Sequence, residues 1–227
     1  MRVSAIIPAF NEQDWIKETV STLRELSFIQ ELIVVDDGSI DCTATIARPW
    51  VDQLITLPKN VGKGVALQAG WKEATGDIIL FLDADLQKSA REVDKLLTPV
   101  VREECDMTIA ILPKAPRKAG FGLTRKLAYQ GIAQMTQQKL QAPLSGQRAF
   151  RRDLFSCVRF MDCGFGIEVA MTIDILRAGY RIKEVPVKFT HRYTSNNLHG
   201  FLHRGKEFWH VYQTLQRKRQ EVKKKDE

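Results

Sequence analysis

Long apolar runs and paired cysteines are both missing from this chain of 227 residues. No stretch approaches the roughly 20 apolar residues of a membrane-spanning helix. The apolar part of residues 1–8 is too short for a secretory signal peptide, so we expect a cytoplasmic protein. The cysteines are scattered, with no CxxC pair, which argues against a zinc site and favours reduced thiols. They are Cys42, Cys105, Cys157 and Cys163.

The sequence has a formal net charge of +7, and the excess cations lie in two places. Residues 114–126 carry several lysines and arginines but no acid, and the tail from Arg217 onwards is lysine-rich. The remainder is nearly balanced, which indicates local anion sites. Strands or helices with interleaved aromatic and basic residues are absent, so we expect no nucleic-acid partner.

Short apolar segments and amphipathic segments alternate over the first 110 residues. We expect strands at residues 3–7, 32–35, 53–57, 78–82 and 107–111, and helices at 12–26, 41–47, 63–73 and 90–102. This βα alternation predicts an α/β fold with a mostly parallel, doubly wound sheet and right-handed crossovers.

The pattern changes after Pro113. We expect helices at residues 124–140 and 166–178, strands at 148–150 and 182–187, a turn at 143–146, and an amphipathic helix from about residue 199. Residues 1–112 and 113–227 are therefore interpreted as two halves of one domain, the second being a C-terminal extension.

The most informative motif is Asp83-Ala84-Asp85, which follows the apolar run of residues 77–82. Open α/β sheets bind ligands at the carboxyl ends of their strands. Two close carboxylates repel unless a cation lies between them and a partner, and hard oxygen ligands suit Mg²⁺ or Mn²⁺. On its own such a pair is equally common as a turn or a helix N-cap.

Three further polar segments end predicted strands: residues 7–12, 34–39 and 60–67. In this order, together with residues 83–85, they resemble the nucleotide-sugar-binding half of GT-A-fold glycosyltransferases of family 2 and its relatives, over residues 3–112. The resemblance implies a GT-A (Rossmann-like) fold and an enzyme that takes a sugar from a nucleotide-diphospho-sugar with Mg²⁺ or Mn²⁺ as cofactor.

The residue chemistry agrees with that resemblance. An ionised Asp37 can accept a hydrogen bond from the N3–H of a uracil-type base, and Lys63 places a cation at a helix start, where phosphates bind. The resemblance implies that a set of five residues holds the nucleoside and that Asp85 holds the metal. The five are Pro8, Glu12, Asp37, Lys63 and Asp83.

The second half has matching segments of its own. Residues 145–150 resemble the family segment that opens towards the acceptor, with Gly146 allowing a close approach. Residues 164–168 resemble the segment whose carboxylate contacts the donor sugar, which assigns Glu168 a catalytic role beside Asp85. Residues 187–192 resemble dolichol-phosphate-sugar synthases and glucosyl-3-phosphoglycerate synthases. This implies His191 as a second metal ligand, although a lone His after a strand is otherwise a surface or core residue.

The helix start at residues 166–170 lacks the acidic pair that hydroxyl acceptors require in inverting family members. A phosphate acceptor is already ionised and needs no general base. The cations of residues 114–126, with Arg148, Arg151 and Arg152, are candidates to hold it; solvated surface is the other interpretation.

Several alternatives stay open at this point. The acceptor is either a polyprenyl phosphate at a membrane face or a small soluble phosphorylated acid. The Phe208, Trp209 and Tyr212 stripe either docks peripherally on that membrane or packs in the core. UDP-glucose is the favoured donor, followed by GDP-mannose, and a homodimer is open. The alternative function is a GT-A-like nucleotide-binding protein without transferase activity.

Overall fold

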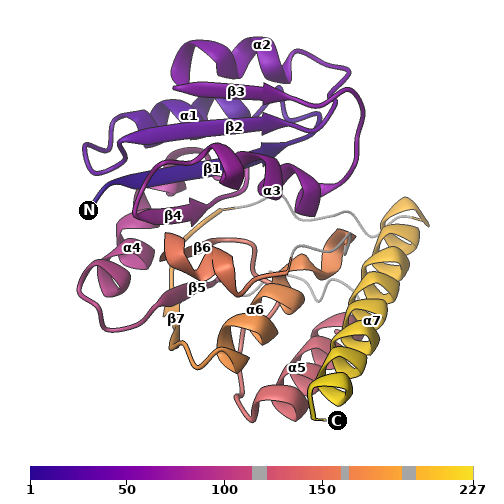
Figure 1. Cartoon of the computed structure of the whole chain (residues 1–227). Coiled ribbons are helices and arrows are strands. Elements are labelled where there is room, and N and C mark those ends of the chain that lie inside the picture. The colour runs from indigo at the N-terminus through magenta and orange to yellow at the C-terminus, as the bar shows by residue number, and fades with distance from the viewer. Residues whose placement is uncertain (114–121, 160–163, 191–197, 227) are drawn as a thin grey trace.

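The computed structural model describes residues 1–113, 122–159, 164–190 and 198–226. Their strands form one seven-stranded sheet in the order β3-β2-β1-β4-β6-β5-β7 (Figure 1). Every neighbouring pair is parallel except the two pairs made by β6. The predicted mostly parallel α/β fold is therefore confirmed. The strands are β1 (Val3–Ala9), β2 (Glu31–Asp36), β3 (Gln53–Thr56), β4 (Ile78–Phe81), β5 (Met107–Ile111), β6 (Arg148–Arg151) and β7 (Ile182–Pro186).

Helices cover both faces of the sheet, as alternating strand residues require. Ala5 and Ile7 of β1 join a core with α1, α2 and α4, whereas Ile6 joins the core that α3, α5, α6 and α7 cover. The helices are α1 (Ile16–Arg24), α2 (Thr43–Ala47), α3 (Lys63–Glu73), α4 (Val93–Val101), α5 (Leu123–Thr136), α6 (Ile167–Arg177) and α7 (Leu198–Asp226). Short 3₁₀ turns are η1 (Arg48–Trp50), η2 (Gln87–Glu92), η3 (Arg152–Ser156) and η4 (Gly164–Gly166).

Several helices are shorter than the sequence predicts, because local turns terminate them. The segment predicted as a helix over residues 90–102 divides into η2 and α4. The helix predicted to reach residue 140 ends at Thr136, because Gln137 adopts a left-handed backbone conformation with φ of 59°.

Strand β6 is inserted antiparallel between β4 and β5, which makes both halves of the chain part of one sheet. Arg148 pairs with Phe81 at the carboxyl end of β4, and Arg151 pairs with Ile78 at its amino end. Arg151 bonds to Asp153, and Arg152 donates to a backbone carbonyl. Of the two interpretations of Arg151 and Arg152, acceptor ligands or solvated surface, the structure favours the second, because both residues lie at the opposite end of the strands from Asp83.

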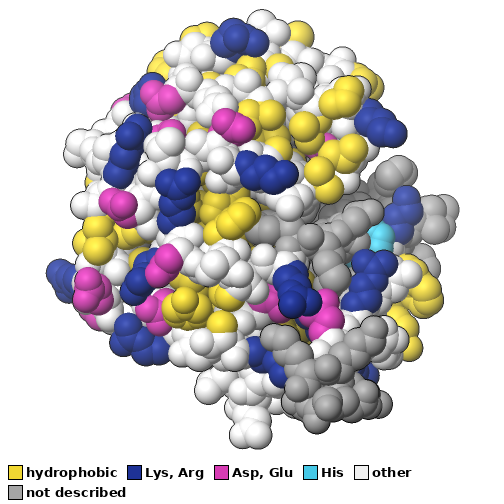
Figure 2. Space-filling view, in the orientation of Figure 1, with side chains coloured by type: hydrophobic (Ala, Val, Ile, Leu, Met, Phe, Trp, Pro, Cys, Tyr) yellow, Lys and Arg dark blue, Asp and Glu magenta, His cyan; other side chains and the backbone are white. Residues whose placement is uncertain are grey.

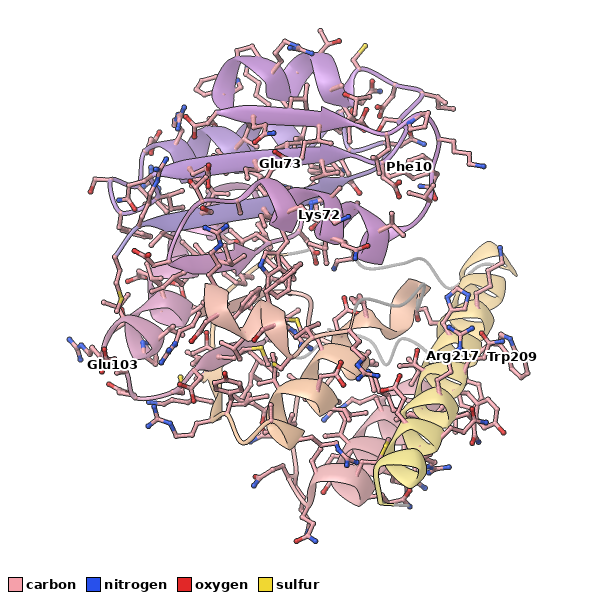
Figure 3. All side chains as sticks on the ribbon, viewed as in Figure 1. Phe10, Lys72, Glu73, Glu103, Trp209 and Arg217 are labelled. Atoms are coloured by element: carbon pink, nitrogen blue, oxygen red, sulfur yellow. The ribbon has the colours of Figure 1, made fainter. Side chains whose placement is uncertain are left out.

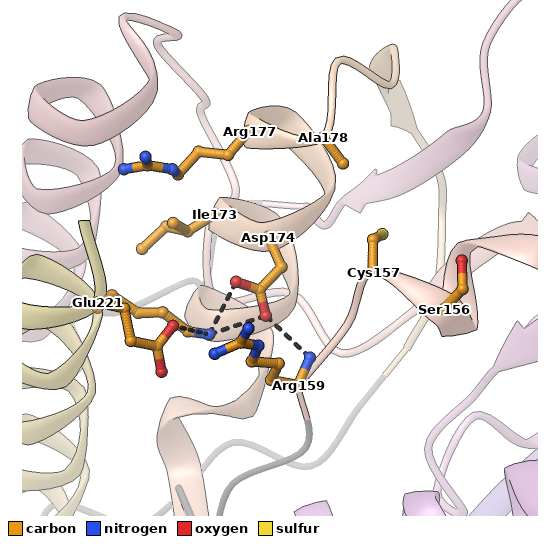
Figure 4. A pocket seen from close by; sticks show the side chains of 9 residues that line it. Ser156, Cys157, Arg159, Ile173, Asp174, Arg177, Ala178 and Glu221 are labelled. Atoms are coloured by element: carbon orange, nitrogen blue, oxygen red, sulfur yellow. Dashed lines mark hydrogen bonds and ion pairs between the residues drawn. The ribbon is translucent and has the colours of Figure 1, made fainter. Parts of the chain in front are cut away.

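Helix α7 packs against α5, α6 and η4 and carries a buried cation. Lys218, one of the cations of the lysine-rich tail, is 1% exposed. Its Nζ lies 2.7 and 2.8 Å from the two carboxylate oxygens of Asp174 on α6 and 3.4 Å from Glu221 (Figure 4). Lys218 therefore anchors α7 to α6. Among the described residues, no helix is both long and apolar enough to cross a membrane.

We expect Lys218→Met to lower the free energy of unfolding by about 3–5 kcal/mol, because the buried Asp174 carboxylate loses its cation. The double variant with Asp174→Leu should recover much of that loss. Urea denaturation measures both. The control is Lys183→Met, which removes an exposed pair with Glu104 and should leave the free energy of unfolding almost unchanged. Equal losses of unfolding free energy in Lys218→Met and Lys183→Met would contradict the role of Lys218 as the anchor of α7.

Candidate active site

The loops that follow β1 and β2 are cross-linked at the carboxyl edge of the sheet. Asn11 takes a left-handed conformation with φ of 54°, and its N–H donates to Ser39 Oγ at 2.9 Å. The N–H of Glu12 donates to Thr43 Oγ1 at 2.8 Å. Pro8 lies in β1 opposite Val35. The segments predicted to hold a nucleoside are thus fastened to one another by short-range polar contacts.

Asp37 fixes the segment that precedes α3. The residue is 3% exposed, its Oδ1 accepts the N–H of Val61 at 2.8 Å, and its Oδ2 accepts the N–H of Gly62 at 2.8 Å. A Cβ at Gly38 would lie 2.4 Å from the carbonyl carbon of Lys59, so only glycine permits this approach. Each Asp37 oxygen has a second lone pair, and its contact with a base stays a prediction.

The Lys63 ammonium joins three elements. It stands at the start of α3, with Nζ 2.7 Å from Oδ1 of Asp83 after β4 and 3.4 Å from Oε1 of Glu168 in the first turn of α6. Burial alone would lower the pKa of Lys63, but the negative charges of Asp83 and Glu168 outweigh it and raise the pKa above its usual value. The structure therefore brings together three predicted site residues around one retained positive charge.

Gln147, which the sequence analysis did not identify, holds the other oxygen of Asp83. It is 1% exposed, and its Nε2 donates to Asp83 Oδ2. Ser145 Oγ lies 3.3 Å from Gln147 Oε1. At Gly146, an added Cβ would lie 2.3 Å from Lys63 Nζ. The missing side chain at Gly146 thus makes room for the Lys63 ammonium, and a close approach of the acceptor there stays a prediction.

Arg148 is buried rather than available to an acceptor, which corrects the expectation for this residue. It is 1% exposed and donates to the Ser145 carbonyl at 2.9 Å and to Thr172 Oγ1 at 2.9 Å. Thr172 in turn donates to the Glu168 carbonyl at 2.7 Å. Burial lowers the pKa of Arg148 to about 10, with the Glu168 charge opposing the shift. The guanidinium stays charged at neutral pH and ties the turn before β6 to the turn of α6 that bears Glu168.

The loop that carries Asp85 is fixed from α1 by Thr19. This hydroxyl is fully buried; it donates to the Ala84 carbonyl at 2.7 Å and accepts the N–H of Gln87 at 2.8 Å. Gln87 has a left-handed φ of 51°. Asp85 itself is half-buried. Thr19 was also missed by the sequence analysis, because it occupies an ordinary position in an amphipathic helix.

The chain after β7 reaches the same loop. The N–H of Thr190 donates to Ser89 Oγ at 2.8 Å, and its hydroxyl donates to the Leu86 carbonyl at 3.3 Å. His191, the predicted second metal ligand, lies outside the described residues. The residue immediately before it is therefore held against the turn that follows Asp85.

The donor set fits a hard divalent cation. Asp83 is bonded to Lys63 and Gln147, and Asp85 is the carboxylate that we expect to hold a metal. Mg²⁺ characteristically uses one or two carboxylates together with substrate phosphates. Within the described parts of the chain, no group of three or more His, Cys, Asp or Glu side chains is placed to hold a metal by itself.

Two cavities lie away from these residues. One of about 280 Å³ lies between α6 and α7 beside the Lys218–Asp174 pair (Figure 4). One of about 840 Å³ lies at the amino edge of the sheet beside Arg151. Neither is lined by a residue predicted to hold the nucleoside, the donor sugar or the metal.

Comparison with known proteins gives consistent matches. The sequence profile of Glycosyl transferase family 2 matches residues 4–159. The dolichol-phosphate mannosyltransferase of Pyrococcus furiosus is 31% identical over 205 residues, which cover 84% of this chain and 56% of that protein. The glucosyl-3-phosphoglycerate synthase of Mycolicibacterium smegmatis is 29% identical over 192 residues, which cover 76% of this chain and 63% of that protein. This chain thus spans less than two thirds of either relative's length.

A similar solved structure is that of glucosyl-3-phosphoglycerate synthase from Mycobacterium tuberculosis in complex with Mn²⁺, UDP-glucose and phosphoglyceric acid. The TM-score is 0.78 at 26% identity, and the match covers 94% of this chain and 78% of that one.

We expect Thr19→Val to lower the free energy of unfolding by about 1–3 kcal/mol, because the Ala84 carbonyl and the Gln87 N–H lose their shared partner. Amide exchange at Gln87 should accelerate. Thr22→Val is the matched control, a buried threonine on the same helix. If both variants had the same stability and the same Gln87 exchange rate, Thr19 would not be the residue that holds the loop of Asp85.

Proposed function

The chain belongs to glycosyl transferase family 2, and from that membership we propose that it transfers a sugar from a nucleotide-diphospho-sugar to a phosphate-bearing acceptor. The observation that carries the proposal is the Lys63 ammonium between Asp83 and Glu168 at the carboxyl edge of the sheet. UDP-glucose is the favoured donor, supported by the Mn²⁺ and UDP-glucose bound in the similar solved structure; GDP-mannose is the second candidate.

We assign the nucleoside to the cross-linked loops at the ends of β1 and β2. Pro8, Glu12 and Asp37 come from segments that hydrogen bonds already fix to one another. A site fixed before the ligand arrives loses little conformational entropy on binding. Asp37 accepts from the base with the lone pairs that Val61 and Gly62 do not use.

We assign Mg²⁺ or Mn²⁺ to Asp85 and His191. Thr19 holds the loop of Asp85, and Thr190, the residue before His191, is hydrogen-bonded to the turn that follows Asp85. When bound, such an ion neutralises the developing charge on the diphosphate leaving group. Asp83 acts differently: it fixes Lys63 and remains bonded to Gln147.

Glu168 is proposed to accept hydrogen bonds from the hydroxyls of the donor sugar. It is 9% exposed, and its Oε1 lies 3.4 Å from the Lys63 ammonium nitrogen. A phosphate acceptor attacks with an oxygen that is already ionised, so no side chain has to remove its proton. Glu168 is thus free to position the sugar.

We propose that residues 1–112 hold the donor and that residues 113–227 supply the acceptor side. The two relatives above are a dolichol-phosphate mannosyltransferase and a glucosyl-3-phosphoglycerate synthase, so each is named for a phosphate compound. Because Arg148, Arg151 and Arg152 are engaged elsewhere, the exposed Arg125 and Lys126 are the described cations of residues 114–126 that remain available. Both acceptor classes stay within the proposal.

We expect wild-type protein to bind either UDP or GDP with a requirement for Mn²⁺, and Asp85→Asn to weaken that binding at least about tenfold by removing a metal ligand. Isothermal titration with each nucleotide, with and without Mn²⁺, measures it. Asp94→Asn, at an exposed carboxylate of α4, is the control. Unchanged Mn²⁺ dependence in Asp85→Asn would overturn the metal assignment.

We expect His191→Ala to lower Mn²⁺ affinity at least about tenfold, since a ligand is lost. His191→Asp should retain more affinity, because a carboxylate oxygen also binds Mn²⁺. Titration of Mn²⁺ into the UDP-saturated protein compares the three. If alanine and aspartate both leave the affinity at the wild-type value, His191 is not a ligand.

A further inference from the structure

The outer side of α7 exposes aromatic residues. Trp209 is 54% exposed, Tyr212 38% and Phe208 37%. The rings of Trp209 and Tyr212 stack with centroids 5.7 Å apart and planes 25° apart. Trp209 projects away from the body of the molecule (Figure 3). The stripe therefore does not serve as core packing; the inward positions of this helix are taken by Val211 and Leu215, which are buried.

Helix α5 extends the same surface. An added Cβ at Gly131 would lie 2.4 Å from Leu215, and Arg219 donates to Gln134 at 2.7 Å, so the two helices lie side by side. Leu123 is 59% exposed and precedes Gly131 by about two helical turns, as Phe208 precedes Leu215. Leu123 therefore lies at the same end of the helix pair. We call Phe208, Trp209 and Tyr212 of α7, together with the neighbouring Leu123 of α5, the α7 aromatic face.

Cations border the α7 aromatic face. Lys206 and Arg219 on α7 and Lys126 on α5 are exposed. Helix α5 contains no acidic residue. Among the α7 residues whose side chains are described, Glu207 lies two positions before Trp209 and thus on the opposite side of the helix, and Glu221 lies 3.4 Å from the buried Lys218. Hydrophobic and basic side chains appear together at this side of the molecule in Figure 2.

The combination of aromatic and basic side chains indicates which kind of surface would cover the α7 aromatic face. Trp and Tyr have an apolar ring and a polar edge, and they concentrate where headgroups meet acyl chains. Lysine and arginine beside them are attracted to anionic headgroups, by about 1 kcal/mol for each residue near the surface. Helices with this division of side chains lie in the interfacial plane without spanning the bilayer.

We propose that the α7 aromatic face docks on an anionic lipid surface, with Trp209 and Tyr212 entering the headgroup region and Lys206, Arg219 and Lys126 facing lipid phosphates. The docking goes beyond the proposed sugar transfer, because it requires neither nucleotide nor acceptor.

A second copy of the chain is a poorer occupant. A stable protein interface takes roughly 20–30 residues from each side, many more than this face offers. A two-fold interface would also set the same patch against itself, so Lys206 and Arg219 would approach the cations of the other copy. An anionic surface meets no such repulsion.

Flotation of the full chain with vesicles tests the proposal in the absence of nucleotide. We expect binding to vesicles of phosphatidylcholine mixed with phosphatidylglycerol and little binding to phosphatidylcholine alone. Trp209→Ala combined with Tyr212→Ala should reduce the partition coefficient at least about tenfold, as expected for two lost interfacial side chains. Val101→Ala, at an exposed apolar position on α4, is the matched control.

Charge reversal tests the contribution of the basic residues to vesicle binding. Lys206→Glu should weaken binding, whereas Lys17→Glu, at an exposed position of α1, should not. Anionic vesicles should also shift the tryptophan emission of the wild type to shorter wavelength, and Trp209→Phe should lose that shift while keeping the wild-type melting temperature.

Failure of the wild type to bind any vesicle would overturn the proposal. So would gel filtration showing a dimer that the Trp209 and Tyr212 double variant converts to a monomer, since a second copy would then cover the face. Because nucleotide titration is a separate measurement, loss of the docking proposal and loss of the transferase proposal are distinguishable.

Discussion

The contact of Lys63 with Asp83 and Glu168 is the interaction on which the rest of the site depends. The three side chains come from the start of α3, the end of β4 and the first turn of α6, which are distant in sequence. Two carboxylates drawn together from such elements repel each other without a cation between them. Lys63 supplies that cation. If its charge were removed, the carboxylates of Asp83 and Glu168 would repel each other, which would favour separation of the end of β4 from α6.

The same contact gives the two aspartates of the Asp83-Ala84-Asp85 motif different tasks. Asp83 is held by Lys63 and by Gln147, whereas Asp85 lies on a loop that Thr19 fixes from α1. Around this pair, Arg148 connects the turn at Ser145 to the helix turn of Glu168 through Thr172. Lys63 and Arg148 thus hold groups from both halves of the chain in fixed relative positions. Precise relative placement of reacting groups favours reaction between them.

The sequence alone predicted the strands and their mostly parallel order, because short apolar and amphipathic segments alternate. The assignment of Asp83, Lys63 and Glu168 to one site came from the resemblance to GT-A-fold glycosyltransferases. It did not predict Gln147 or Thr19, whose roles depend on which strands are neighbours. The insertion of β6 between β4 and β5 is a non-local pairing, and no local pattern encodes it. The same insertion moved Arg151 and Arg152 to the far edge of the sheet.

The sequence also left open which residues of α7 are buried. Lys218 of the lysine-rich tail is buried against Asp174, whereas Trp209 is exposed although its spacing also suited a core position. A helical period of 3.6 residues defines which residues share a face. It does not define which face meets another helix, and that is decided here by Gly131 and Gly166, whose missing side chains admit Leu215 and Thr214 of α7.

The most direct test of the account is a crystal structure with Mn²⁺ and UDP, in which anomalous scattering locates the metal. The account predicts a Mn²⁺ peak at about 2.1–2.3 Å from an Asp85 oxygen, with Lys63 still bonded to Asp83 and near Glu168. A peak coordinated by Asp83, with Lys63 displaced from it, would contradict the division of tasks between the two aspartates.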